Sequence, residues 1–461
     1  MAQDDRPTRK DPTEGLDGFP VLRCDVAGID VGSEQHWVCA AAREGPGREV
    51  AVFGATTPSL EQLIAWLQDR GVRSVALEST GVYWIVPHEM LEAAGFEVVL
   101  ADTRALGRVP GRPKSDRRDC EWIQRLHACG LLRGAFRPAE QVCILRTLMR
   151  DKGTLVAERA DWLRRMQKSL DQMNVRVHRA VSDLDGVTGM AILRAIAQGE
   201  RDPHRLAALR HQRCQKSEAE IAAQLTGHWR ADHLFSLQQA LHLYDAITAR
   251  LEAYDQEIQR QLAHMTPADR RDVDAPPPPK ATKAKAMKSR GHDPLRQALY
   301  RVSGVDLTCI DALGVETVSI VLSEYGTDLS RFPTEKHFVA HMRLAPYKPI
   351  SGGKVVKNRK KPGSASARVG AALRMAALTA RRSQTALGAY YRRIAQRCGA
   401  DVAVFATARK LAQLIYRLLR WGQPYVDEGA AAYEQRYHEA RVKRIAASAK
   451  QLGYSLVSVP S

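Results

Sequence analysis

The chain has 461 residues, enough for two to four domains, and its 44% hydrophobic content fits a globular protein with ample core. It contains no apolar stretch long enough to span a membrane, no signal peptide and no lipidation motif, so we expect a cytoplasmic protein with no membrane partner. Its eight cysteines are scattered without a C-x-x-C pair, which argues against disulfides and structural zinc, while a net charge of +18 indicates an anionic partner.

The positive charge is concentrated in the C-terminal part of the chain. Residues 21–137 carry 14 Lys and Arg against 15 Asp and Glu, whereas residues 331–420 carry 20 against two. Charge runs are usually solvated helix faces, but ninety residues with two acids argue against that interpretation. The pattern predicts a nearly neutral domain that holds metal-binding carboxylates and a basic domain that binds nucleic acid.

The N-terminal region is expected to form an α/β domain. Residues 1–20 are polar and predict a disordered tail. From 21 to 137, short apolar runs such as LRCDVAGID, EVAVFGAT and SVALEST alternate with helical patterns such as SLEQLIAWLQDRG. An early run of strands followed by strand–helix alternation is typical of a mixed α/β sheet.

Four carboxylates in this region form a candidate metal site. Asp30 and Glu78 each end an apolar run, and Asp116 and Asp119 lie three residues apart at the start of an expected helix. Asp102, which also ends an apolar run, is a rival ligand. Each residue alone could be a turn former or a helix cap. Together they have the order of an RNase H-like (RuvC-like) nuclease site, and their mutual repulsion would be relieved by a pair of Mg²⁺ ions.

Residues 138–266 are expected to be largely helical. Lys152 and Arg159 interrupt the first of two apolar stripes. The stripes favour a dimerising coiled coil and an intrachain helical hairpin equally. Their members are Leu145, Leu148, Leu155, Trp162, Met166 and Met173, and then Leu237, Leu241, Tyr244, Leu251, Ile258, Leu262 and Met265. Residues 267–293 predict a Pro- and Lys-rich linker.

The basic region is expected to be mainly helical over 294–422, with a helical tail over 423–461. Its segment IDALGVETVSIVLSE (310–324) resembles a helix-hairpin-helix. The backbone amides of such a turn can hold a phosphate without reading bases.

Ser351 precedes two glycines within a cluster of cations. Gly352 and Gly353 would permit close approach of a nucleic-acid backbone, and the cations would stabilise charge on a phosphate under attack. These cations are Lys348, Lys354, Lys357, Arg359, Lys360 and Lys361. The competing hydroxyls are Ser364, Ser366, Tyr347, Tyr390 and Tyr391. Chemistry alone does not choose among them.

Both motif sets together resemble the IS110 family of transposases, over residues 24 to about 420. GIDVG, ALESTG and KSDRRD match that family's carboxylate tetrad, and GVDLT, LSEYGTDLSRFPTEKHF and ISGGK match its transposase domain, with the nucleophilic serine at Ser351. The chain departs from the family at Cys120, where Ala is usual, and at DALGVE, which replaces a Pro-Gly-Ile-Gly turn. The first change should not affect metal binding, and the second puts the hairpin geometry in doubt.

The resemblance implies a DNA recombinase with a composite site, in which the metal-bound carboxylates and the serine meet across domains and subunits. It implies Mg²⁺, replaceable by Mn²⁺, and a 5′-phosphoserine intermediate with release of a 3′-hydroxyl. It also implies a bridge RNA that pairs with donor and target DNA, a homodimer that assembles into a tetramer through contacts of the helical middle, and a nucleoid-associated prokaryotic protein.

Two other functions fit parts of the sequence. A nuclease of the Holliday-junction resolvase type would use water as the nucleophile, with Ser351 as a phosphate contact. An architectural nucleic-acid-binding protein would bind no metal at its acidic cluster.

Overall fold

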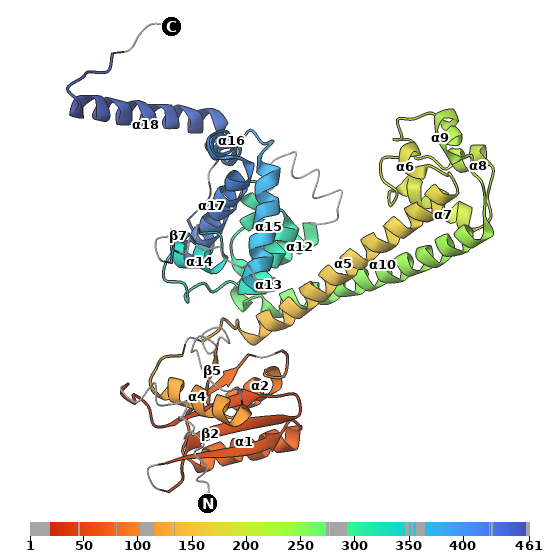
Figure 1. The fold of residues 1–461 in the computed structure, drawn as a ribbon. Helices are drawn as coiled ribbons and strands as arrows, with labels where there is room; N and C mark the ends of the chain where they lie inside the picture. The colour runs from red at the N-terminus through yellow and green to blue at the C-terminus, as the bar shows by residue number, and fades with distance from the viewer. Residues whose placement is uncertain are drawn as a thin grey trace, which may run out of the picture. The chain divides into compact units, whose positions relative to one another are not determined.

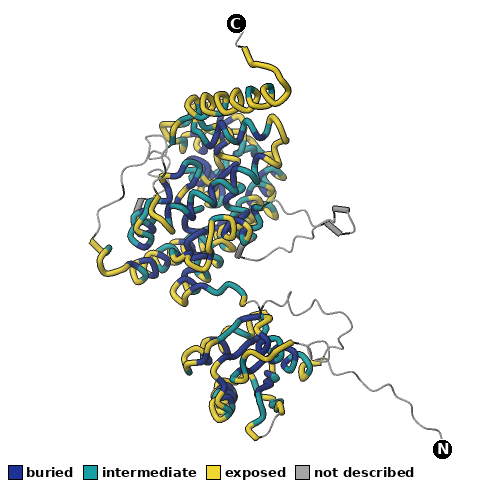
Figure 2. Tube along the Cα trace, turned by 90° about the vertical axis from the view of Figure 1, so that its left-hand side faces the viewer, coloured by how far each residue is buried: buried dark blue, intermediate teal, exposed yellow. Residues whose placement is uncertain are grey.

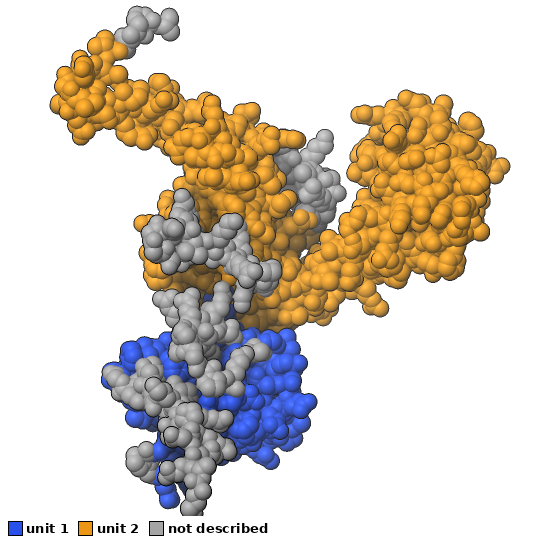
Figure 3. All heavy atoms as spheres, in the orientation of Figure 1, with its two compact units in different colours: residues 1–137 blue, residues 138–461 orange. Residues whose placement is uncertain are grey.

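The structure is a computed structural model that describes most of the 461 residues and divides into two compact units, Met1–Arg137 and Pro138–Ser461 (Figure 3). The described residues are 19–44, 47–79, 81–101, 115–132, 134–272, 276, 293–345, 350, 351, 354, 355, 365–423, 425 and 427–457. Residues 1–18 of the expected tail and most of the expected 267–293 linker lie outside them. Within the described ranges, no helix is long and apolar enough to cross a bilayer.

Unit 1 is built on one five-stranded sheet, with strand order β3-β2-β1-β4-β5 (Figure 1). The first three strands pair antiparallel, and β1, β4 and β5 pair parallel. The strands are β1 (Val26–Val31), β2 (Gln35–Ala41), β3 (Arg48–Gly54), β4 (Ser74–Glu78) and β5 (Glu97–Ala101). This mixed sheet confirms the predicted α/β class and fits an RNase H-like fold.

Helices cover both faces of this sheet. They are α1 (Thr57–Asp69), α2 (Ile85–Ala93) and α4 (Asp116–Ala128). Ile29 and Leu77 point to the face covered by α1 and α2, where Leu63 joins the same buried cluster. Ala76 points to the opposite face and packs against Trp122 of α4. Burial on both faces explains why the central strands are continuous apolar runs instead of alternating ones.

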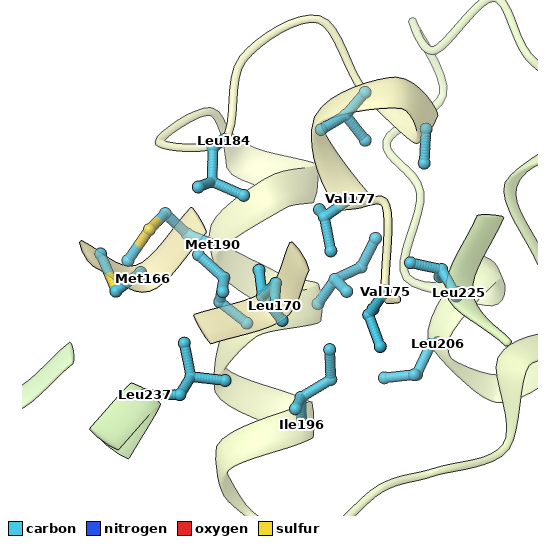
Figure 4. Packing of buried hydrophobic residues seen from close by; sticks show 14 of the residues in the cluster. Met166, Leu170, Val175, Val177, Leu184, Met190, Ile196, Leu206, Leu225 and Leu237 are labelled. Atoms are coloured by element: carbon cyan, nitrogen blue, oxygen red, sulfur yellow. The ribbon is translucent and has the colours of Figure 1, made fainter. Parts of the chain in front are cut away.

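A long intrachain hairpin opens unit 2. Helices α5 (Glu140–Gln172) and α10 (Ala231–Met265) pack against each other along their length, and four short helices lie at the far end of the pair (Figure 1). These are α6 (Val177–Ala180), α7 (Val187–Ala197), α8 (Pro203–Ala208) and α9 (Glu218–Leu225). Met166, Leu170 and Leu237 belong to the apolar core there (Figure 4). The two apolar stripes therefore pack against each other within one chain.

The two cations that interrupt the first stripe find partners on α10. Lys152 pairs with Asp255, and the Arg159 guanidinium lies 5.7 Å from the centre of the Tyr244 ring. Both interactions link α5 to α10, so Lys152 and Arg159 help to fix the register of the two helices.

The rest of unit 2 is a helical body around α17, which packs against α14, α15 and α16. The helices are α12 (Asp293–Ser303), α13 (Val315–Tyr325), α14 (Glu335–His341), α15 (Ala365–Ala380), α16 (Ala386–Cys398), α17 (Ala400–Trp421) and α18 (Gly429–Gln451). Figure 2 shows buried residues concentrated in this body, whereas α18 is largely exposed and contains no buried residue. The predicted mainly helical C-terminal half is confirmed.

The helix-hairpin-helix expected over 310–324 is not confirmed. A short 3₁₀ turn at Leu307–Cys309 precedes this segment, and the segment itself contains one α-helix, α13. Between them, Ala312 adopts a left-handed conformation with φ of 69°. The segment is therefore an irregular turn leading into one helix.

Candidate active site

Asp30 and Glu78 lie at the carboxyl ends of neighbouring parallel strands. Ile29 of β1 stands opposite Leu77 of β4, so the two acids follow directly at the next position of each strand. Because strand residues alternate between faces, Asp30 shares a face with Gly28, and Glu78 shares one with Ala76. This is the face covered by α4.

Gly28 allows α4 to approach β1 closely. A Cβ atom at this position would lie 2.2 Å from the backbone nitrogen of Gln124 and 2.6 Å from the carbonyl oxygen of Cys120. Any side chain larger than hydrogen would therefore push the helix away. Since Cys120 directly follows Asp119, this contact also sets how far the first turn of α4 lies from the sheet.

The direction of α4 carries its first turn toward the same sheet edge. At the other end of the helix, the Ala128 carbonyl accepts hydrogen bonds from the backbone N–H groups of Leu22 and Arg23 at 2.9 and 3.1 Å. His127 is hydrogen-bonded at 2.8 Å to Ser74, the first residue of β4. The helix thus runs antiparallel to β1 and β4, and its N-terminus points toward their carboxyl ends.

The first turn of α4 contains the other two acids. Ser115 caps the helix by accepting a hydrogen bond from the Arg118 backbone N–H at 3.4 Å, and Asp116 and Asp119 follow. Acids are favoured in this turn because the helix dipole is positive there. The structure thus brings both strand acids and both helix acids to one edge of the sheet. Asp102, the rival ligand, lies outside the described residues.

The chemistry of these donors fits a hard divalent cation. Carboxylate oxygens are the ligands such ions prefer, whereas the nearby thiols are unsuitable. Cys39 stands beside Gly28, and burial raises its thiol pKa to about 12. Burial likewise raises the pKa of Cys120, whose thiol donates to the Arg117 carbonyl at 3.0 Å. In the described part of the chain, no three His, Cys, Asp or Glu side chains are arranged as a metal-binding group.

Ser351 lies in unit 2 in a two-stranded hairpin. Its backbone in β6 (Ile350–Ser351) is opposite Lys354 in β7 (Lys354–Val355), so two residues, Gly352 and Gly353, connect the strands. The side chains of Ser351 and Lys354 lie outside the described part, as do all atoms of Lys348, Gly352, Gly353, Lys357, Arg359, Lys360 and Lys361.

The competing hydroxyls differ in their positions. Tyr391 is buried in the core formed with Ile394 and Ala403, which withdraws it from contact with DNA. Tyr390 is half-buried, with its ring 6.4 Å from that of Tyr433. Tyr347, Ser364 and the side chain of Ser366 lie outside the described residues.

Two models of transposase families match parts of the chain. A family model described as a transposase, of the IS110 DEDD type, matches residues 27–175. A second, described as the IS116/IS110/IS902 transposase family, matches residues 304–392. The two matches together cover about half of the chain, one over the carboxylate site and one over the serine hairpin. A search of curated proteins found no match.

Proposed function

The chain belongs to the IS110 family of transposases, and from that premise we propose that it cuts and rejoins DNA strands through a covalent bond between Ser351 and a DNA phosphate. Membership implies a DNA substrate, and a DEDD-type domain indicates dependence on a divalent metal. The placement of two strand-end acids and the first turn of α4 at one sheet edge supports the metal-dependent part of this proposal. The match of residues 304–392 to the transposase family supports the part assigned to Ser351.

The proposed metal ligands are Asp30, Glu78, Asp116 and Asp119. Their order along the chain is the D-E-D-D of the matching family model. Two Mg²⁺ ions, replaceable by Mn²⁺, would supply charge stabilisation at the phosphate undergoing transfer. The protein contributes the placement of the acids, which depends on Gly28 and on the capped start of α4.

The proposed nucleophile is the Ser351 hydroxyl. A new bond forms between its Oγ and phosphorus, the bond from phosphorus to the 3′ oxygen breaks, the serine proton passes to solvent, and the leaving oxygen is released as a 3′-hydroxyl. The 5′-phosphoserine conserves the energy of the phosphodiester, so a 3′-hydroxyl from another strand can reverse the step without ATP. The cations of the hairpin segment would hold the DNA phosphates.

The proposed partners are donor DNA, target DNA and a structured bridge RNA that pairs with both. A protein with concentrated positive charge binds mainly the nucleic-acid backbone, and base pairing can then supply the sequence choice. We also propose a homodimer that assembles into a tetramer. Because the apolar seams of α5 and α10 are filled within the chain, dimer contacts of this hairpin would use its outward side chains, such as Phe235.

The carboxylate assignment predicts a large loss of activity in Glu78→Gln. Removing one charged ligand should lower Mg²⁺-dependent cleavage of cognate DNA at least ~100-fold, since metal ligands and their supports affect activity on this scale. Glu61→Gln, an exposed acid on α1, is the matched control and should cleave normally. Cleavage would be followed on denaturing gels over a range of Mg²⁺ and Mn²⁺ concentrations. Equal cleavage by Glu78→Gln and wild type would contradict the site.

A further inference from the structure

A cavity of about 970 Å³ in unit 2 lies among α16, α17 and α18 and the residues that follow α14. Its volume is within the range of small-molecule sites, and both apolar and charged side chains line it. Most of this lining lies beyond residue 392, where the second family match ends. The cavity is distinct from the carboxylate site of unit 1.

The lining carries more positive charge than its carboxylates neutralise. Arg417 is held by Glu335, at 2.6 and 3.1 Å, and Arg436 pairs with Glu428. Arg409 and Lys410 also line the cavity, and neither forms an ion pair with a described residue. Two cations are therefore available to an anion that enters.

The position of Lys410 favours a bound anion. Burial lowers its pKa first, and the nearby charges of Arg417 and Arg436 lower it further, while Glu335 acts in the opposite direction. A half-buried ammonium beside other cations is unfavourable unless a negative charge approaches it. A phosphate group in the cavity would provide that charge.

Aromatic rings form part of the wall. Tyr390 of α16 and Tyr433 of α18 both line the cavity, and their rings meet edge to face at 6.4 Å. The Arg393 guanidinium lies 5.5 and 5.0 Å from these two rings and 4.0 Å from that of Tyr437, so cation–π contacts join the two helices. Tyrosine rings beside basic residues are the combination on which single-stranded nucleic acids stack.

The cavity is also linked to the serine hairpin through the chain. Leu344 and Ala345 line it, and Ser351 follows Ala345 by six residues. Six residues span at most about 22 Å, which is the length of a few nucleotides. Arg417 fixes α17 to α14 by binding Glu335, and Tyr416 fixes α17 to the segment before α14 by donating to the Phe332 carbonyl at 2.6 Å.

We infer that this cavity binds one nucleotide of a single-stranded nucleic acid, with its phosphate at Arg409 and Lys410 and its base against Tyr390 and Tyr433. The inference rests on the proposed function for the identity of the partner as a nucleic acid. A free nucleoside phosphate has the same chemistry, so the test has to distinguish a strand from a free nucleotide.

The test measures binding of a fluorescein-labelled oligo(dT) strand to the full chain by anisotropy, without Mg²⁺. The double variant Arg409→Gln/Lys410→Gln should weaken binding at least ~10-fold and reduce the slope of log affinity against log salt by about 0.7, the contribution of the one strand phosphate contact that is lost. The control Arg441→Gln/Lys443→Gln removes the same charge from the exposed part of α18. It should change affinity less than ~3-fold, because charges outside the contact are screened.

Two further variants keep the outcome decisive. Arg409→Lys/Lys410→Arg preserves both charges and should retain binding, which excludes a folding defect as the cause of the loss. Tyr433→Leu should weaken binding about 5- to 100-fold through lost stacking. Equal effects of the cavity and control double variants would overturn the inference. Saturation by AMP with no displacement by oligo(dT) would also overturn it, in favour of a free nucleotide.

This assay does not depend on catalysis. Binding is measured without Mg²⁺, so it requires neither metal-bound carboxylates nor the Ser351 hydroxyl. If the carboxylate or serine assignment is wrong, the binding result should therefore be unchanged. If the cavity does not bind a nucleotide, the cleavage results should be unchanged.

Discussion

Ala312 is one of the described non-glycine residues with a positive φ, together with Asn174 and Arg343. Its φ of 69° is in the left-handed region, where a Cβ atom crowds the following carbonyl. The family pattern places Gly in the corresponding Pro-Gly-Ile-Gly turn. Ala312 therefore adopts the left-handed conformation without the glycine that suits it.

We predict that Ala312→Gly stabilises the protein by about 1 kcal/mol. Glycine relieves a left-handed penalty of ~1–2 kcal/mol and loses part of this gain through its greater freedom in the unfolded chain. Ala157→Gly, at an exposed position inside α5, is the control and should lose about 1 kcal/mol. Urea denaturation of both variants measures the difference. A destabilised Ala312→Gly variant would show that the turn does not strain Ala312.

At the scale of elements, the contact between α4 and β1 sets the distance of Asp116 and Asp119 from the sheet. Gly28 faces backbone atoms of Gln124 and Cys120, which cannot rotate away as a flexible side chain would. The glycine is thus a positioning residue for Asp116 and Asp119, although it carries no chemistry itself.

We predict that Gly28→Ala reduces DNA cleavage strongly and destabilises unit 1 by about 1–3 kcal/mol, the usual cost of overpacking. The helix must shift, and the two helix acids shift with it. Gly47→Ala is the matched control, because its added Cβ would meet only the Ala42 side chain at 3.7 Å. Cleavage and thermal unfolding are measured for both. If Gly28→Ala cleaves DNA but needs a higher Mg²⁺ concentration, the acids are displaced in a protein that is still folded.

Helices α5, α13 and α15 meet at a buried carboxylate. Glu324 of α13 is 1% exposed and accepts hydrogen bonds from Arg150 of α5 at 2.9 and 2.8 Å. Arg146 donates to its backbone carbonyl at 2.6 Å, and Arg368 of α15 lies 4.0 Å from its side chain. Glu324, the acid of the LSEYG motif, therefore links the hairpin of α5 and α10 to the helical body around α17.

We predict that Glu324→Gln destabilises unit 2 by about 2–3 kcal/mol, because it removes the buried counter-charge of Arg146, Arg150 and Arg368. The cost is below that of a fully buried pair, since water reaches these arginines. Glu257→Gln, which breaks an exposed pair with Arg260, should cost less than about 1 kcal/mol. Chemical denaturation of the two variants tests the difference. Similar small losses in both would mean that solvent compensates the arginines of the joint.

Much of the element order was predictable from sequence because its signals are local. Strand runs, the first two helices and the long apolar stripes follow from periodicity, and the structure confirms the mixed sheet and the helical C-terminal half. Periodicity could not decide whether α5 and α10 pack within one chain, because both arrangements bury the same seam. The helix-hairpin-helix expected over 310–324 is not confirmed, because Ala312 has a left-handed backbone in the part of the segment that precedes α13, and no composition signal shows this.

At the scale of the whole molecule, charge and chemistry divide between the two units. Unit 1 holds the carboxylates on a nearly neutral domain, and the basic residues are concentrated in unit 2. The sequence could predict this division, since counting charges requires no structure. The basic cavity could not be predicted from the sequence. Lys410 and Arg417 do recur at helical spacing on α17, but Tyr433 and Arg436 join them only because α18 packs nearby.

The central claim is that Ser351 is the nucleophile of an IS110-family recombinase. The most direct measurement incubates the purified full chain with Mg²⁺, its flanking-element RNA and labelled cognate DNA, then maps any protein–DNA adduct by mass spectrometry. We predict an adduct at Ser351 that disappears, together with strand cleavage, in Ser351→Ala and persists in Ser364→Ala. Cut DNA without an adduct, undiminished in Ser351→Ala, would contradict the account and identify water as the nucleophile of a resolvase-type nuclease.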